Sequence, residues 1–540
     1  MKKLALLLCL CLLASVLTMG ATAEEEAFQG IGIVHTQYGD VSGVPGETEK
    51  VTVFKGVPYA APPVGELRWA EPQDPDVWEG VRACDAYADA AMQPTYTKYM
   101  MRPGSDFYPA GAPKQSEDCL YLNVTTPAVS ADEKLPVMVW FHGGGLSHGY
   151  CWQVPFDGEK LASKGVIVVT VGHRLGAMGF ISLPQLTAES EYGASGNYGL
   201  MDCIKSIEWV HENIAAFGGD PEKVMAFGQS GGGAKTLGTV AAPQTQGMIS
   251  CFSTQSSFGI FNGSGSNMGM TSLAENEEAG LQLLDQIGVS RDATLEELRA
   301  IPAETLYSVE GSASGSMVID GKYILGDRAD FFLGQGNLDG IAMMAGWVFG
   351  EKGSYEATDP ADLYAKLREK YGSLVDKYDL ENTFPITDAN VGYYNYLLKQ
   401  NEALDEIRLY AKLKSERNEN SPSYIYSFGR VTPNKDFGWH SGELWYMFNN
   451  MGYSFEGMDT EWQPAWEVYD YMVGETTSSY WSNFAGHDDP NEPGLVNWPA
   501  ADAENQPYQY IDVVTTTFDE LTPFDQMVME YYTNLYGLGE

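Results

Sequence analysis

The sequence predicts an α/β protein with one large, mostly parallel β-sheet flanked by helices. Three observations support this class: apolar runs of strand length recur along the chain, a helical pattern lies between them, and one run leads directly into a glycine-rich turn. The composition is 44% hydrophobic and 19% charged over 540 residues, which is typical of a folded globular protein. The sequence contains no repeat or low-complexity tract.

Five segments are predicted to be buried strands. They are rich in β-branched and aromatic residues and are bounded by glycines or turns. Because they are apolar at consecutive positions, both of their faces are expected to be covered, as in a parallel sheet. The segments are 137–141, 166–171, 224–227, 341–348 and 424–428.

An amphipathic helix is predicted before the third of these strands. Its apolar residues recur at steps of three and four, which creates one stripe for packing on a sheet, and a Gly-Gly pair ends it. The stripe consists of Leu200, Ile204, Ile207, Val210 and Ile214. A more helical and charged region at about 270–415 predicts a cap within a single catalytic domain that spans 24–540.

Residues 1–23 are predicted to be a secretory signal peptide. Two lysines precede an apolar run, and the sequence Ala21-Thr22-Ala23 fits cleavage after Ala23. The apolar run is shorter than the roughly 20 residues that a membrane span needs. We therefore expect a secreted, extracellular protein without a membrane span in the mature chain; an uncleaved anchor is the alternative.

The chain is strongly acidic, with 32 basic and 73 acidic residues and a net charge of −41. This charge disfavours binding to nucleic acid or to an anionic membrane and favours a neutral or cationic ligand. The cysteine and histidine spacings do not fit a zinc site, so no metal site of this kind is expected. An odd number of cysteines follows the signal segment, which leaves at least one free thiol: Cys84, Cys119, Cys151, Cys203 and Cys251.

Two Gly-x-Ser-x-Gly sequences contain Ser147 and Ser230. A nucleophilic serine on a strained turn needs a buried strand before it, a helix after it and very small flanking residues. Ser230 directly follows the 224–227 strand and precedes a segment that can begin a helix, whereas Ser147 follows three glycines. We therefore predict that Ser230 is the nucleophile and that Ser147 is a loop serine.

A serine hydroxyl needs a general base, and the chain has seven histidines. In hydrolases with a strand–serine–helix turn the histidine comes last in the chain, which leaves His440 and His487. His440 follows the 424–428 strand, and from there it can reach over the sheet. We predict that His440 is the base and that His487 is a surface residue.

Longer motifs occur in order along the chain: FKGVPYAAPPVGELRW at 54–69, SEDCLYLNV at 116–124, a block at 196–233, WHSGELWYMF at 439–448 and YWSNFAGHDDPNEPGLVNWP at 480–499. In these motifs the chain resembles the type-B carboxylesterases, the family that includes cholinesterases and bacterial p-nitrobenzyl esterases. The resemblance implies an α/β-hydrolase fold and hydrolysis of a small-molecule ester without a cofactor.

The resemblance also implies particular roles at the site. Ser230 is the implied nucleophile, His440 is the implied base, and a glutamate completes the triad. The implied oxyanion hole consists of the backbone N–H groups of Gly144, Gly145 and Gly231.

The position of the acid depends on how the loop at 346–356 is counted. Counting forward from Gly346 places the acid at Glu351, and counting back from Gly353-Ser354 places it at Lys352. A lysine cannot orient a histidine or stabilise its imidazolium form. We therefore predict Glu351 as the acid, with Glu356 as the alternative.

Several scaffold features follow from the same resemblance. It implies two buried ion pairs, Arg68–Glu117 and Arg174–Asp202. The resemblance leaves undecided whether Cys84 and Cys119 form a disulfide, because Cys84 lies earlier in the chain than the family's partner cysteine.

Two residues depart from the family pattern: His173 replaces an aromatic residue, and Gly231 replaces an alanine. Glycine leaves the third oxyanion donor less constrained, so Gly231→Ala is expected to be tolerated. Two alternatives to a carboxylesterase stay open. One is a catalytically silent, cholinesterase-like binding or adhesion module, and the other is a thioesterase, amidase or lactonase that uses the same site.

Overall fold

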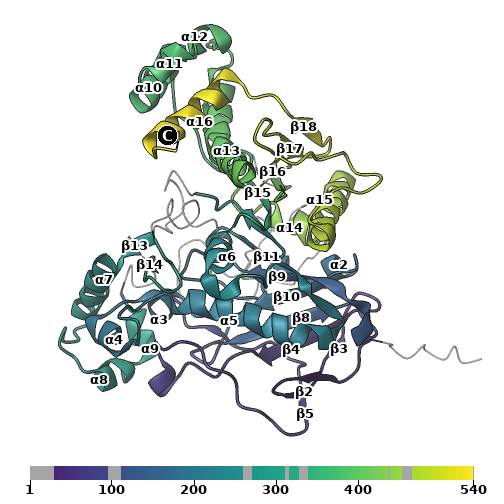
Figure 1. Cartoon of the computed structure of the whole chain (residues 1–540), viewed down its shortest axis with the longest axis vertical. Helices are drawn as coiled ribbons and strands as arrows, with labels where there is room; N and C mark the ends of the chain where they lie inside the picture. Colours follow the sequence, from purple (N-terminus) through teal and green to yellow (C-terminus); the bar gives the residue numbers. More distant parts are fainter. Residues whose placement is uncertain are drawn as a thin grey trace, which may run out of the picture.

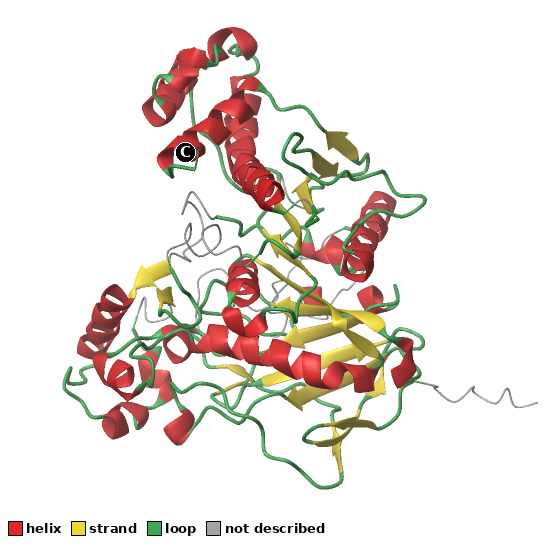
Figure 2. Ribbon diagram, viewed as in Figure 1, coloured by secondary structure: helices red, strands yellow, loops and turns green. Residues whose placement is uncertain are grey.

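The computed structural model describes residues 30–94, 111–259, 270–309, 315–326, 338–418, 420–433, 435, 438–452 and 465–538. The predicted signal peptide at 1–23 lies outside the described residues. Figures 1 and 2 show a central sheet with helices on both faces and a further group of helices at one end of the molecule.

The central sheet has eleven strands within the described residues, in the order β18-β17-β16-β15-β12-β11-β9-β10-β8-β4-β3. The strands from β17 to β10 are parallel to their neighbours, and β18, β8, β4 and β3 pair antiparallel at the two edges. The strands are β3 (Val44–Pro45), β4 (Thr52–Pro58), β8 (Tyr121–Thr126), β9 (Leu135–Phe141), β10 (Ile167–Val171), β11 (Gly219–Gln229), β12 (Cys251–Gln255), β15 (Ala342–Val348), β16 (Ser423–Phe428), β17 (Tyr508–Ile511) and β18 (Thr516–Phe518).

All five predicted strands are confirmed and belong to the parallel part of the sheet. They correspond to β9, β10, β11, β15 and β16, with boundaries within a few residues of those expected except at the start of β11. The end of β11 decides the position of the site, because its last residue, Gln229, directly precedes Ser230.

Successive side chains of the central strands enter two different cores. Val224 and Ala226 of β11 pack in one core, whereas Met225 and Phe227 pack with Trp140 in the other. This alternation follows from the two-residue repeat of a strand, and both cores are covered by helices. The first core lies under α5 (Tyr198–Asn213), α6 (Gly231–Ala241), α13 (Val391–Arg417) and α16 (Pro523–Leu535), and the second under α2 (Glu159–Ala162), α14 (Leu444–Met447) and α15 (Val468–His487).

The region predicted to form a helical cap contains two groups of helices with β15 between them in the sequence. The first group is α7 (Leu273–Gln286), α8 (Leu295–Arg299) and α9 (Ala303–Leu306). The second is α10 (Pro360–Tyr371), α11 (Leu374–Lys377), α12 (Leu380–Thr383) and α13, which Figure 1 shows at the far end of the molecule beside α16.

Both implied ion pairs are present; Arg174–Asp202 is buried, and Arg68–Glu117 is partly buried. Arg174 donates from Nη2 to Asp202 Oδ1 at 2.7 Å and from Nε to Asp202 Oδ2 at 2.9 Å, with side chains that are 3% and 0% exposed. Arg68 donates from Nε to Glu117 Oε2 at 2.7 Å. The first pair ties the loop after β10 to α5, and the second ties the segment after β4 to the segment before β8.

The five cysteines from Cys84 to Cys251 are buried free thiols, so Cys84 and Cys119 are not joined. Among the described residues, no helix is both long enough and apolar enough to cross a membrane.

We predict that Asp202→Asn lowers the free energy of unfolding by about 3–5 kcal/mol, because it leaves the buried Arg174 guanidinium without a counter-charge. Urea or thermal unfolding measures the change. The control is Asp285→Asn, which removes an exposed pair with Arg291 and should cause little change. Equal effects of the two variants would contradict the prediction.

Candidate active site

Ser230 lies on a sharp turn between β11 and α6. Its backbone has φ 55° and ψ −125°, a strained combination for a residue with a side chain. A Cβ atom at Gly228 would overlap the backbone of Gly232, and one at Gly232 would overlap the Phe141 carbonyl oxygen. The turn therefore has the strain and the small flanking residues that a nucleophilic serine requires.

His440 and Glu351 meet across two loops that follow neighbouring strands, β16 and β15. His440 Nδ1 lies 2.5 Å from Glu351 Oε2. The Glu351 side chain is 2% exposed, and its other oxygen accepts hydrogen bonds from Ser256 Oγ at 2.6 Å and from the Val348 N–H at 2.9 Å. These contacts leave the carboxylate little freedom to rotate, so it can hold the imidazole in one orientation.

The hydrogen bonds define the tautomer of His440. Because Nδ1 faces a carboxylate, it carries the proton and donates it, which leaves the Nε2 lone pair as an acceptor. His440 Nε2 lies 3.3 Å from the amide nitrogen of Gln229, while Gln229 Oε1 accepts from Ser441 Oγ at 2.9 Å. The basic nitrogen of His440 is thus directed toward the residue next to Ser230.

The pKa of the His440 imidazole is raised. Desolvation of the imidazole lowers this pKa, but the hydrogen bond to Glu351 and the negative charge of Glu351 raise it by more. The side chain keeps 49% of its surface exposed, so it can contact a molecule that enters from solvent.

A second carboxyl group, Glu443, lies near Glu351 and was not singled out from the sequence. Burial first, and then the charge of Glu351, raises the pKa of Glu443 to about 8. Ser256 Oγ lies between the two carboxyl groups, 2.6 Å from Glu351 Oε1 and 3.5 Å from Glu443 Oε1. At neutral pH Glu443 is therefore mainly uncharged.

The three predicted oxyanion glycines converge at the start of α6. Gly144 and Gly145 follow β9 with φ +94° and +64°, and the main chain of Gly145 packs against Gly231. The Gly144 carbonyl accepts from the N–H groups of Ser147 and His148 at 3.3 and 3.1 Å. The N–H groups of the three glycines find no acceptor within the described part of the chain.

The expectation that Gly231→Ala is tolerated is wrong for this structure. A Cβ atom at position 231 would overlap the carbonyl group of Gly145, and this neighbour is backbone rather than a flexible side chain. The loop after β9 would have to move to accept alanine. The sequence motif alone could not reveal this contact, because Gly145 and Gly231 are far apart in the chain.

Of the alternative residues, Glu356 and His487 are exposed, whereas Ser147 lies in the glycine loop, where its Oγ donates to the Gly144 carbonyl at 3.3 Å. The backbone carbonyl of Glu356 accepts from Lys366 Nζ at 2.9 Å. His487 lies at the end of α15, and Ser147 Oγ also contacts the ring of its neighbour His148. The described residues contain no group of three or more His, Cys, Asp or Glu side chains suited to a metal ion.

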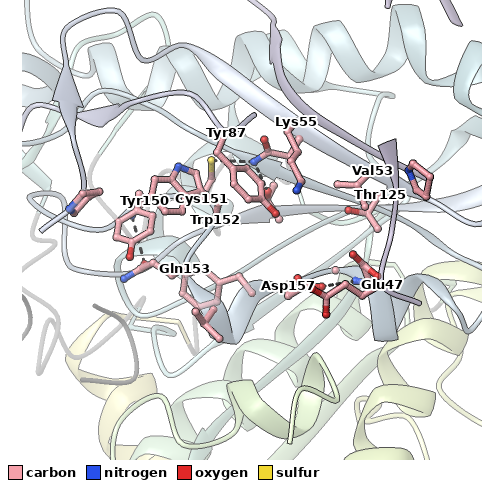
Figure 3. A pocket seen from close by; sticks show the side chains of 18 of the residues that line it. Glu47, Val53, Lys55, Tyr87, Thr125, Tyr150, Cys151, Trp152, Gln153 and Asp157 are labelled. Carbon is pink, nitrogen blue, oxygen red and sulfur yellow. Dashed lines mark hydrogen bonds between the residues drawn. The ribbon is translucent and has the colours of Figure 1, made fainter. Parts of the chain in front are cut away.

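A cavity of about 460 Å³ lies beside the loop that follows the glycines (Figure 3). The Tyr87 and Trp152 rings stack there at 5.4 Å, and Lys55 Nζ lies 4.8 Å from the Tyr87 ring centre. Neither Ser230 nor His440 lines this cavity, so it is separate from the cluster at the elbow.

The sheet and the strained serine turn define an α/β-hydrolase. A profile of the Carboxylesterase family matches residues 31–324 and 348–527, and the chain belongs to this family. It is a carboxylic ester hydrolase.

The relatives cover nearly the whole chain. The chain is 32% identical over 495 residues to fumonisin B1 esterase of Sphingopyxis macrogoltabida, with 89% of this chain and 87% of the relative covered. It is 30% identical over 509 residues to para-nitrobenzyl esterase of Bacillus subtilis, with 89% and 94% covered. A solved structure of a carboxylesterase from Geobacillus stearothermophilus superposes with a TM-score of 0.72 at 27% identity, covering 92% of this chain and 99% of that one.

We predict that Gly231→Ala lowers kcat for ester hydrolysis by about 10²-fold, because displacing the loop moves backbone donors away from the developing oxyanion. Steady-state kinetics measures the change. Gly392→Ala in α13 is the matched control, since a Cβ atom there meets no other atom within 4 Å. Unchanged kcat in Gly231→Ala would show that the loop adapts without loss.

Proposed function

We propose that the protein is a secreted serine carboxylesterase that works through a Ser230–His440–Glu351 triad and an acyl-enzyme intermediate. The observation that carries the proposal is the 2.5 Å contact of His440 Nδ1 with a buried, doubly anchored Glu351. It is supported by the strained backbone of Ser230 and by the direction of His440 Nε2 toward the elbow.

In the first step, His440 Nε2 accepts the proton of Ser230 as Oγ attacks the ester carbonyl. The hydrogen bond from the Gln229 amide to His440 Nε2 must break as this proton is transferred, because a protonated Nε2 can no longer accept. The N–H groups of Gly144, Gly145 and Gly231 stabilise the oxyanion. His440 then protonates the departing alcohol.

In the second step, His440 removes a proton from water, which attacks the acyl-enzyme and releases the acid. Glu351 orients the imidazole and stabilises its charged form in both steps. Because Glu443 is mainly neutral, the carboxylate of Glu351 alone offsets the positive charge of the His440 imidazolium.

The substrate class follows from the family as a small-molecule carboxylic ester, and the acidic chain favours a neutral or cationic one. Secretion rests on the sequence of residues 1–23. A silent binding module is disfavoured because nothing in such a role needs a strained serine and a carboxylate-oriented histidine together.

We predict that Ser230→Ala lowers kcat for short-acyl p-nitrophenyl esters by at least about 10³-fold, because the nucleophile is lost. Spectrophotometric assay of released p-nitrophenol measures it. Ser147→Ala, in the other Gly-x-Ser-x-Gly sequence, should retain most of the activity. Full activity in Ser230→Ala would show that Ser230 is not the nucleophile.

We predict that Glu351→Gln lowers kcat by about 10³-fold and moves the acidic limb of kcat/KM to lower pH. Glu351 raises the pKa of His440, so without it the imidazole stays neutral, and therefore basic, at lower pH. Glu356→Gln is the control and should leave the profile unchanged. A larger effect at Glu356 would show that the acid is misassigned.

A further inference from the structure

Lys235 is a fully buried lysine in α6, five residues after Ser230. Its Nζ donates a hydrogen bond to His173 Nε2 at 2.6 Å. No carboxylate among the described residues pairs with it. Burial lowers the pKa of Lys235 to about 8, so the side chain is still mainly an ammonium at neutral pH.

Two histidines extend this contact toward the glycine loop. His173 Nδ1 donates to the Val171 carbonyl at 3.2 Å, which leaves Nε2 free to accept from Lys235. The rings of His173 and His142 lie 4.3 Å apart. Burial, and then the charge of Lys235, lowers the pKa of both imidazoles, so they are neutral. Lys235 therefore carries the positive charge of this Lys235–His173–His142 stack.

The stack touches both ends of the loop that contains Gly144 and Gly145. His142 Nδ1 donates to the Gly143 carbonyl at 2.9 Å. At the other end, Gly149 packs so closely on the His142 ring that a Cβ atom there would lie 2.5 Å from Nδ1. The stack thus connects the helix that begins after Ser230 with the loop that faces its N-terminus.

A buried ammonium without a counter-ion is unfavourable for stability, and an apolar side chain of similar length would fill the space at lower free energy. The same charge is favourable for a reaction that develops negative charge nearby, because charges interact strongly where water is excluded. The position of this ammonium beside the elbow therefore suits a role in catalysis better than a role in folding.

We propose that Lys235, acting as an ammonium through His173 and His142, positions the oxyanion loop and favours the negatively charged transition state of ester hydrolysis. This inference rests on the proposed function. Lys235 does not touch the reacting atoms, so it is a positioning residue rather than a catalytic one.

The other titratable groups that face Lys235 do not change charge between about pH 7 and pH 9. His142 and His173 come from the ends of β9 and β10, and burial lowers their pKa values. Burial also lowers the pKa of His148 in the glycine loop and raises the pKa of the Cys203 thiol on α5. A pH-dependent difference between wild type and a Lys235 variant in this range therefore reports the charge of Lys235.

The test compares wild type with Lys235→Met in kcat for a short-acyl p-nitrophenyl ester between about pH 6.5 and pH 9.5. The wild-type kcat should exceed the variant's by at least about tenfold at pH 7. This ratio should fall toward one as pH rises through about 8, because wild-type Lys235 then loses its charge. A lysine with a structural role would give a ratio that does not change with pH.

Thermal unfolding provides the second readout. Lys235→Met should be more stable than wild type at pH 7, which also makes a failure to fold unexpected. The difference should narrow above about pH 8, because folded wild type loses the proton there while the unfolded chain keeps it to about pH 10.4. Stability of wild type therefore rises over the range in which its kcat advantage disappears.

Lys414→Met is the matched control. Lys414 is also fully buried, its pKa is lowered to about 7 by burial, and it donates to the Ser421 carbonyl at 3.0 Å, before the start of β16. This variant should keep wild-type kcat at every pH. His173→Phe, which keeps a ring against His142 but removes the acceptor for Lys235, should lower kcat as Lys235→Met does.

The inference would be overturned if the ratio of wild-type kcat to Lys235→Met kcat were constant with pH, or if Lys235→Met had wild-type kcat at pH 7. Neither result would contradict Ser230-dependent ester hydrolysis. Absence of Ser230-dependent hydrolysis in the wild type would overturn the proposed function and this inference with it. The Ser230→Ala variant, assayed in parallel, distinguishes the two failures.

Discussion

The close approach between the start of α6 and the loop after β9 is the constraint on which the rest of the site depends. β11 must turn into α6 within one residue, so Ser230 adopts a strained backbone and Gly228 and Gly232 have no room for side chains. The Gly145 carbonyl then contacts Gly231 directly, and this contact sets the distance between the loop and the serine. The parallel sheet makes the arrangement possible, because β9, β11, β15 and β16 all end at the same edge.

Four ionisable groups lie near the carboxyl ends of these strands, and each has a different set of contacts: Glu351, His440, Glu443 and Lys235. Glu351 is anchored by Ser256 and the Val348 N–H, and it faces His440. Glu443 is buried and mainly neutral. Lys235 keeps its charge without a carboxylate, whereas the scaffold ion pair Arg174–Asp202 is fully matched. A matched pair stabilises the scaffold, whereas the unmatched ammonium of Lys235 lies where a reaction that develops negative charge can use it.

Much of the fold was predictable because it depends on local pattern. Continuous apolar runs identified the five central strands, and the three- and four-residue steps identified α5. The strand–serine–helix sequence singled out Ser230. Order along the chain left His440 and His487, and the position of His440 after the 424–428 strand decided between them. Gln229, Ser256, Glu443 and Lys235 were not predicted, because their significance comes from contacts between residues that are up to about 210 positions apart. The same reason explains the error at Gly231.

The sequence by itself determined the class of the protein, the strands of the parallel sheet, the turn at Ser230 and the order of the candidate triad. Each follows from short local patterns or from the order of those patterns along the chain. The tertiary structure decided which loop carboxylate faces His440, how closely the glycine loop approaches Gly231, and that Lys235 is buried against His173. These properties arise only when the carboxyl ends of separate strands meet at one edge, where distance, burial and dielectric environment are set by segments remote in sequence.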